Sequence, residues 1–290
     1  MLRSMYAGIS GMKGFQTQLD VIGNNIANVN TSGFKKGRVT FQDLMSQMTS
    51  GAQGSTDARG GVNAKQVGLG SQLGSIDTIH TQGFRQTTEN PLDFAIEGDG
   101  MFVLASDLDN QTNIDLNNAD VAYSRAGNFY LDDDGHIVNP QGLYLVGFAA
   151  NEDGEIDDRQ SVLQIPEDAE SFSVETNGTV HYIQNSETKV AGQVALASFS
   201  NPAGLEKDGN NLYRDSQNAG LARDGDNNID LITPEENGAA SIVSGALEMS
   251  NVDLSNEFTD MITAQRGFQA NTRIITTSDE ILQELVNLKR

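Results

Sequence analysis

The chain has 290 residues, enough for one to three ordinary domains, and 37% of them are hydrophobic while only 6% are aromatic. It contains no cysteine, which excludes disulfide bonds, thiol catalysis and cysteine-bound zinc. The net charge of −22 lies in the middle of the chain, because residues 1–84 sum to +3, residues 85–245 to −22 and residues 246–290 to −3, so we expect no binding to nucleic acid or anionic membranes.

The first 32 residues predict a long helix with a narrow apolar stripe. Apolar side chains recur at steps of three and four residues, at Leu2, Met5, Ile9, Met12, Phe15, Leu19, Ile22, Ile26 and Val29. No run of about 18 apolar residues occurs here or elsewhere, so we expect no membrane insertion. The glycines and polar residues of this segment also differ from a cleaved secretory signal.

The predicted helix ends in an asparagine-rich stretch, "GNNIANVNTSGF", which contains Asn24, Asn25, Asn28, Asn30, Gly33 and Phe34. Asparagine and glycine tolerate left-handed backbone and therefore end helices. Several asparagines exceed what a helix end needs, and the spacing places Asn24, Asn25 and Asn28 on one face. Uncharged amides there suit a junction between the helix ends of neighbouring chains. A polar helix end that faces water is the alternative.

Residues 33–84 are predicted to connect this helix to the next domain. The part from 45 to 75 is rich in Gly, Ser and Gln and has only weak patterning, which is typical of an extended or flexible linker.

Residues 85–245 predict an acidic all-β domain, a sandwich or a barrel. Short β-type runs such as "DFAIEGDGMFVLAS" and "SFSVETNGTVHYI" alternate with turn residues. Asp134-Gly135, Asp153-Gly154 and Asn177-Gly178 stand at the spacing of hairpin turns.

Residues 246–290 predict a second long helix. In "SNVDLSNEF", Asp253 or Ser255 can cap it, and Glu257 falls in the first turn, where a negative charge suits the helix dipole. One apolar stripe contains Leu254, Phe258, Met261, Phe268, Ile275, Leu282 and Val286, and a second contains Ile262, Ile274, Ile281, Leu285 and Leu288. Two such helices at opposite ends of a chain are expected to pair as a coiled coil and to need further partners. Gln265 is a polar residue at a seam position of this helix, which also indicates that the helix has more than one partner.

The residues offer little catalytic chemistry. Three scattered histidines, His80, His136 and His181, lack the spacing of a metal pair. In "DGDNNIDLITPE", Asp224, Asp226, Asn228, Asp230 and Glu235 fall at positions 1, 3, 5, 7 and 12 of a calcium loop, but the required Gly at position 6 is Ile229. We expect a solvated acidic loop, no catalytic residue, no metal and no cofactor. A soluble calcium-binding β-domain protein is the alternative from another functional class.

Two long motifs carry a family resemblance. "LDVIGNNIANVNTSGFK" (19–35) and "GALEMSNVDLSNEFTDMITAQRGFQANTRIITTSDEILQELVNL" (245–288) resemble the terminal signatures of the rod and hook family of bacterial flagellar axial proteins. The resemblance implies an α+β chain whose terminal helices pair into an inner tube domain, with the β-domain inserted between them. It further implies a non-enzymatic helical homopolymer, exported by the flagellar type III apparatus without a cleaved signal and located outside the cell.

The resemblance also implies which residues join subunits. They are Leu19, Ile22, Asn24, Asn25, Ile26, Asn28, Asn30, Gly33, Phe34, Asn251, Val252, Leu254, Phe258, Met261, Gln265, Arg266, Phe268, Leu282 and Leu285. Phe41 and Met45 fit the family's short export motif. Within the family, "VIGNNIAN", "GALEMSNVDLS", "AQRGFQAN" and "LVNLKR" favour the hook over the distal rod. The implied partners are then the rod, hook cap and hook–filament junction proteins and the export apparatus.

Overall fold

A computed structural model describes residues 2–55, 59–106, 114, 116, 119–151, 156–221, 229, 231–235 and 240–288. The chain forms two compact units. Unit 1 comprises Met1–Ala27, Lys36–Ile79 and Val252–Arg290, and unit 2 comprises Asn28–Lys35 and His80–Asn251.

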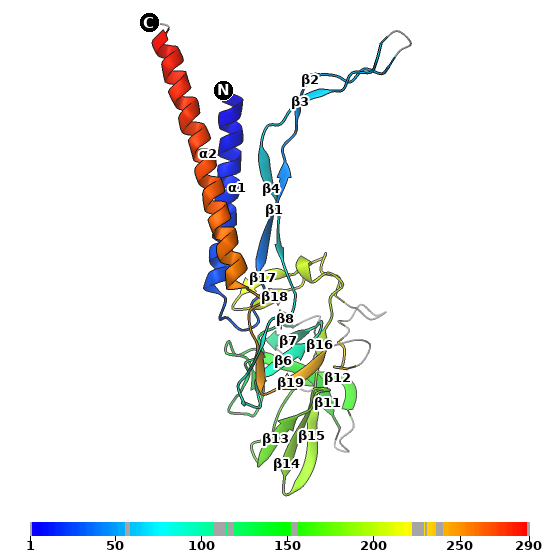
Figure 1. Cartoon of the computed structure of the whole chain (residues 1–290). Coiled ribbons are helices and arrows are strands. Elements are labelled where there is room, and N and C mark those ends of the chain that lie inside the picture. The colour runs from blue at the N-terminus through cyan, green and yellow to red at the C-terminus, as the bar shows by residue number, and fades with distance from the viewer. Residues whose placement is uncertain are drawn as a thin grey trace. The chain divides into compact units, whose positions relative to one another are not determined.

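Unit 1 contains both terminal helices and a β-ribbon. Its elements are α1 (Leu2–Ala27), β1 (Gly37–Asp43), β2 (Gln47–Ser50), β3 (Lys65–Val67), β4 (Ser71–Thr78) and α2 (Leu254–Leu288). The two helices lie side by side and run in opposite directions (Figure 1). Neither described helix has the length and apolarity that a membrane crossing requires.

The helix ends follow the local signals of the sequence. α1 stops at Ala27, within the asparagine-rich stretch. α2 begins after Asp253, whose Oδ1 accepts a hydrogen bond from the Ser255 amide at 2.9 Å, so Asp253 rather than Ser255 is the cap. Glu257 in the first turn is buried.

The segment expected to be an extended or flexible linker is extended and forms two antiparallel strand pairs. β1 pairs with β4 from Gly37↔Thr78 to Asp43↔Ser71, and β2 pairs with β3 further out. β1 and β4 contact α1 (Figure 1). The β-type run "GRVTFQD" makes β1, and the ring of its Phe41 packs against Phe15 of α1. This segment therefore joins the helices in unit 1 instead of standing apart.

Unit 2 is rich in β-strands. They are β5 (Arg85–Thr87), β6 (Phe94–Glu97), β7 (Met101–Ser106), β8 (Asp120–Ser124), β9 (Tyr130–Leu131), β10 (Ile137–Val138), β11 (Tyr144–Ala150), β12 (Ile156–Val162), β13 (Ser171–Val174), β14 (Thr179–Gln184), β15 (Glu187–Val194), β16 (Leu196–Ala197), β17 (Glu206–Gly209), β18 (Leu212–Arg214), β19 (Ser241–Ser244) and β20 (Ala246–Glu248), with a 3₁₀ turn, η1, at Pro202–Gly204.

The largest sheet that the described residues form has twelve strands, with the main order β13-β14-β15-β11-β7-β8-β18-β17. This path is open at β13 and at β17 within the described residues, so it is an open sheet and not a closed barrel. Two of the expected turns are present, because Gly135 and Gly178 have φ of +79° and +80° in the connections β9–β10 and β13–β14. Asp153-Gly154 lies outside the described residues.

The core of unit 2 lies on both faces of β7. Side chains alternate along a strand, so Met101, Val103 and Ala105 join one buried apolar cluster while Phe102 and Leu104 join the other. All five are almost fully buried. A strand buried on both faces explains why "MFVLA" is a continuous apolar run.

Candidate assembly surfaces and a buried charge cluster

The α1–α2 contact in unit 1 depends on small residues that face large ones. A methyl group added to Gly267 would lie 2.5 Å from the ring of Phe15, and one added to Gly11 would lie 2.7 Å from the Asn271 side chain. Helices approach this closely only where one residue has no side chain, so these glycines set the spacing of the pair. Coiled-coil geometry stays a prediction.

Many apolar side chains of α2 are exposed to solvent. Their exposed fractions lie between 39% and 83%, and they are Leu254, Phe258, Ile262, Ile274, Ile281, Leu285, Val286 and Leu288. Met261, Phe268, Ile275 and Leu282 are half-buried. Leu254, Phe258 and Ile262 are spaced four residues apart and therefore share one face of the helix. Exposed apolar surfaces mark interaction sites, so this apolar face of α2 is the main candidate for contact with another protein.

The predicted assembly residues divide between the two units and by exposure. In unit 1, Ile22, Asn25 and Val252 are buried, Leu19, Ile26, Met261, Phe268 and Leu282 are half-buried, and Asn24, Leu254, Phe258, Gln265, Arg266 and Leu285 are exposed. In unit 2, Gly33 is buried, Asn28, Phe34 and Asn251 are half-buried, and Asn30 is exposed. Their role between subunits stays a prediction.

One amide of the asparagine-rich stretch is used inside unit 1. Asn25 Nδ2 donates to the Gly37 carbonyl at 2.9 Å and to Glu257 Oε2 at 3.1 Å, and the Gly37 amide donates to Asn25 Oδ1 at 3.0 Å. Lys36 Nζ lies 3.6 Å from Glu257 Oε1. Asn25 therefore joins the end of α1 to the start of β1 and to the first turn of α2. This amide serves the chain's own fold, and its role at a junction between chains stays a prediction.

The residues of the predicted export motif have different surroundings. The ring of Phe41 packs against Phe15, with centroids 6.2 Å apart. Met45 is 87% exposed. The export role stays a prediction.

The calcium-loop residues Asp224, Asp226, Asn228 and Asp230 lie outside the described residues, and Glu235 is exposed. Among the residues that the structure does describe, no group of three or more His, Cys, Asp or Glu side chains could hold a metal ion.

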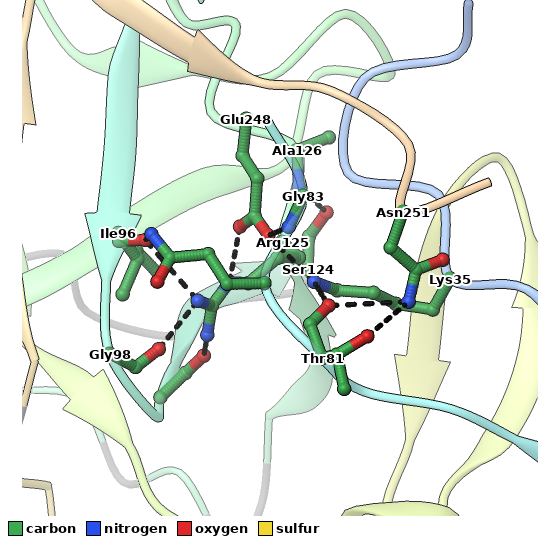
Figure 2. Close-up of polar contacts among 12 residues, drawn as sticks. Lys35, Thr81, Gly83, Ile96, Gly98, Ser124, Arg125, Ala126, Glu248 and Asn251 are labelled. Atoms are coloured by element: carbon green, nitrogen blue, oxygen red, sulfur yellow. Dashed lines mark hydrogen bonds and ion pairs between the residues drawn. The ribbon is translucent and has the colours of Figure 1, made fainter. Parts of the chain in front are cut away.

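Unit 2 contains a buried charge cluster that the sequence did not predict. Glu248 Oε1 accepts from Lys35 Nζ at 2.6 Å, and Glu248 Oε2 accepts from Arg125 Nε at 2.6 Å (Figure 2). The Gly83 amide donates to Glu248 Oε1 at 2.8 Å. The three charged residues expose only 1–5% of their surface. Their sequence positions are far apart, so no local pattern indicates the cluster.

The cations of this cluster also hold backbone carbonyls. Arg125 donates to the carbonyls of Ile96 and Gly98 (Figure 2) and to that of Gly100, and Lys35 Nζ donates to the Thr81 carbonyl at 2.8 Å. Every charged group therefore has several partners, which offsets the cost of burying it.

Burial and charge act against each other on the ionisation of these groups. Burial alone would raise the pKa of Glu248, but Arg125 and Lys35 outweigh it and hold that pKa below its ordinary value. Burial lowers the pKa of Lys35, against the pull of Glu248. The two cations therefore keep the carboxylate of Glu248 ionised despite its burial.

His80 lies beside the cluster, in a cavity of about 240 Å³ lined also by Lys35, Arg125, Asp99 and Phe199. Its ring packs on Tyr213, with centroids 5.7 Å apart, and both ring nitrogens are buried without a hydrogen-bond partner. Burial, with Lys35, Lys207 and Arg125 nearby, lowers the pKa of His80 to about 4. His80 is therefore neutral near pH 7.

Three family models match separate parts of the chain. The flagella basal body rod protein model matches residues 5–35, the flagellar hook protein FlgE/F/G D1 domain model matches residues 95–182, and the flagellar basal body rod FlgEFG protein C-terminal model matches residues 243–288. The flagellar basal-body rod protein FlgG of Bacillus subtilis is 51% identical over 291 positions, covering all of both chains.

The chain belongs to the flagellar rod and hook family. This family consists of structural proteins of the bacterial flagellum, including its basal body and hook. FlgG of Caulobacter vibrioides is 35% identical over 292 positions, covering 99% of this chain and all of that protein. The flagellar hook protein FlgE of Borreliella burgdorferi is 31% identical over 459 positions, covering all of both.

The helices and the buried charge cluster of this subunit lie in the regions that match the family models. The model matching residues 5–35 covers most of α1, Asn25 and Lys35, and the model matching residues 243–288 covers Glu248 and α2. Arg125 lies in the region that matches the D1 domain model. All three charged residues of the buried cluster therefore fall within matched regions, one in each.

Proposed function

We propose that this chain is a subunit of the flagellar rod, which polymerises through its helices. The lengths of the alignments with the relatives favour the rod over the hook. The alignments with FlgG of Bacillus subtilis and Caulobacter vibrioides span 291 and 292 positions, nearly the length of this chain. The alignment with the hook protein of Borreliella burgdorferi spans 459 positions, so that protein has a large region without a counterpart here.

This proposal replaces the hook, which the sequence motifs alone had favoured. Those motifs lie in the terminal segments, and rod and hook proteins share these, so they do not separate the two. The identity of 51% to a rod protein exceeds the 31% to a hook protein over full-length alignments. The hook stays the second candidate because one matched family model is that of a hook protein domain.

The exposed apolar face of α2 supports polymerisation. Phe258 is 50% exposed and Ile262 is 55% exposed, and they are neighbours on one face of the helix. A contact of this face with the next subunit would bury them. Contacts that repeat from head to tail without closing into a ring produce a filament.

We also propose that the subunit assembles outside the cytoplasm. Export by the flagellar type III apparatus without a cleaved signal, and contact with other rod proteins at the polymer ends, are part of this proposal. Contact with the hook cap and hook–filament junction proteins belongs to the second candidate, the hook.

The first experiment deletes the gene and images isolated basal bodies by electron microscopy. Rods that stop short support the rod. Complete rods without hooks would mean the hook, and normal flagella would contradict membership of either structure.

A second experiment separates assembly from folding. Phe258→Ser with Ile262→Ser is expected to leave the purified chain as stable as the parent and to remove it from basal bodies. The matched control is Thr259→Ser with Thr263→Ser, which changes exposed neighbours on the same helix while keeping their hydroxyl groups. Incorporation of the apolar-face variant at the parent's level would refute the role of this face.

A further inference from the structure

Phe84 is an exposed aromatic side chain on a fixed backbone in unit 2. It is 83% exposed to solvent. The Gly83 amide donates to Glu248 Oε1 at 2.8 Å, and the Met249 amide donates to the Phe84 carbonyl at 2.7 Å. The buried charge cluster and the residue after it therefore hold the backbone on which Phe84 stands. An aromatic side chain held in this way is pre-organised for a partner, because binding orders little further backbone.

The chain around Phe84 is basic. Residues 78–88 contain Arg85 but no aspartate or glutamate. The side chain of Arg85 is 50% exposed, and its Nη1 lies 3.5 Å from Oε2 of Glu97, which is also exposed. Ion pairs between exposed side chains contribute little, so Arg85 can exchange Glu97 for a carboxylate of a partner. Phe84 and Arg85, here called the knob, thus offer an aromatic ring beside a positive charge.

A shallow apolar groove in the same unit matches the aromatic part of the knob. The groove has a volume of about 400 Å³ and lies between the β9–β10 turn and the start of β13. Its apolar lining includes Leu131, Ile165 and Phe172. The residues that line it do not include Phe84 or Arg85, so the knob of a subunit does not fill the groove of that subunit. The groove is large enough for one aromatic side chain.

The rim of this groove matches the charge of the knob. Asp132, Glu167 and Glu170 line the groove and are exposed. Residues 126–158 and 160–188, which supply most of its walls, contain no lysine or arginine. An occupant with an apolar group beside a positive charge therefore complements the groove, and an acidic occupant is repelled.

The knob and the groove both lie at strand edges. Among the described strands, β5 pairs only with β20, and β13 is the end of the largest sheet, where it pairs only with β14 (Figure 1). Phe84 directly precedes β5, and Ser171 and Phe172 of the groove begin β13. Edge strands are accessible to another chain. A partner can therefore reach either feature without any change in the sheets.

We propose that the knob of one subunit occupies the groove of a second copy of this chain, with the Phe84 ring against Phe172 and Arg85 beside Glu170. This proposal rests on the proposed function, because the polymer brings the copies together. The knob and the groove are different surfaces, so the contact repeats from head to tail as a filament requires. The buried cluster around Glu248 then serves assembly, since it holds the backbone that presents Phe84.

The test replaces Phe84 with the photoreactive amino acid p-benzoylphenylalanine, which keeps an aromatic ring at this position. A strain expresses only this chain, its isolated basal bodies are irradiated, and the cross-linked dimers are digested and analysed by mass spectrometry. The partner peptide is expected to contain Leu131 or residues 165–172. The matched control carries the same amino acid at Thr188, an exposed residue of β15 that does not line the groove, and its cross-links are expected to avoid these peptides.

The outcomes separate this docking from the proposed function. If the Phe84 chain is present in basal bodies but labels other peptides, or if the Thr188 control labels the groove equally, the docking is refuted and the rod assignment stands. If the parent chain is absent from basal bodies, both fail.

A charge exchange decides the case in which the photoreactive chain does not assemble. Arg85→Glu and Glu170→Arg are each expected to lower the amount of the chain in basal bodies about threefold or more, and the chain with both changes is expected to recover it. The control combines Arg85→Glu with Glu187→Arg at an exposed position outside the groove, and no recovery is expected. The docking is refuted if the single changes have no effect, if their losses simply add, or if the control recovers equally.

Discussion

Asn25 and Gly37 exchange two hydrogen bonds, as two paired residues of an antiparallel sheet do. The Gly37 amide donates to Asn25 Oδ1 at 3.0 Å, and Asn25 Nδ2 donates to the Gly37 carbonyl at 2.9 Å. A side-chain amide thus pairs with the first residue of β1, twelve positions further along the chain. The same Nδ2 reaches the buried carboxylate of Glu257 at 3.1 Å, so one side chain links three segments of unit 1.

Asn25→Asp is expected to lower the free energy of unfolding by about 3 kcal/mol, because it removes the donor and places a second carboxylate beside buried Glu257. Urea unfolding followed by the helical circular dichroism signal measures it. Asn30→Asp at an exposed position is the control, with an expected change within about 0.5 kcal/mol. Equal effects of both substitutions would contradict the role given to Asn25.

Glu248→Gln is expected to cost about 3–5 kcal/mol of stability, because Lys35 and Arg125 then remain buried without their counter-charge. Thermal unfolding of the full chain measures this loss. The control is Asp120→Asn, which weakens an exposed pair with Arg214 and should leave the Tm close to the parent's. A Tm for Glu248→Gln that matches the control would show that the cluster contributes little.

His80 predicts a loss of stability in mild acid. Its pKa is about 4 in the fold and 6.5 in the unfolded chain, so between these values the unfolded chain takes up a proton that the folded chain does not. Stability therefore falls as the pH drops from 6.5 to 4. We expect His80 to contribute about 2 kcal/mol to this fall, after allowing for its partial exposure to solvent.

The variant that tests this is His80→Phe, which keeps a ring against Tyr213 but cannot titrate. Its urea midpoint should change less with pH between 6.5 and 4 than the parent's. The ionised carboxylate of Glu248 also stabilises the fold, and this contribution is lost as the pH falls below its unfolded pKa of 4.5. The loss occurs in both proteins. Parallel pH profiles of the two proteins would exclude His80 as the cause.

Gly33→Ala and Gly23→Ala are expected to change the free energy of unfolding in opposite directions. Gly33 has φ of +69°, and a methyl group there would lie 2.5 Å from the Ala126 amide nitrogen, so alanine should cost about 2 kcal/mol or more. Gly23 is an exposed position in α1 with open space around it, and alanine should stabilise the helix by up to about 1 kcal/mol. Chemical unfolding of both variants compares the signs directly.

Local patterns predicted the parts of this fold that local chemistry decides. The two apolar stripes gave helices that end at Ala27 and begin at Leu254, and Asp253 caps the second as its side chain allows. Gly135 and Gly178 turn the chain where Asp-Gly and Asn-Gly predict it. In each case the deciding interactions lie within a few residues.

The parts that sequence reasoning missed depend on residues far apart in the chain. Glu248 is 213 positions from Lys35 and 123 from Arg125, and nothing near any of them indicates a buried partner. The ribbon between Gly37 and Thr78 was taken for a linker because Gly, Ser and Gln weaken its period, although the register between β1 and β4 fixes it. The bonds of Asn25 to Gly37 and Glu257 were not predicted either, because they join residues that are 12 and 232 positions apart.

The two ends of the long segment of unit 2, His80–Asn251, lie close together. Asn251 Nδ2 donates to the Thr81 carbonyl at 3.2 Å, and the Gly33 amide donates to the Glu248 carbonyl at 2.8 Å. A segment with joined ends can grow or be exchanged without moving the residues that flank it. An insertion or a deletion in the middle of this segment is therefore expected to leave the sequence and the pairing of the two helices unchanged.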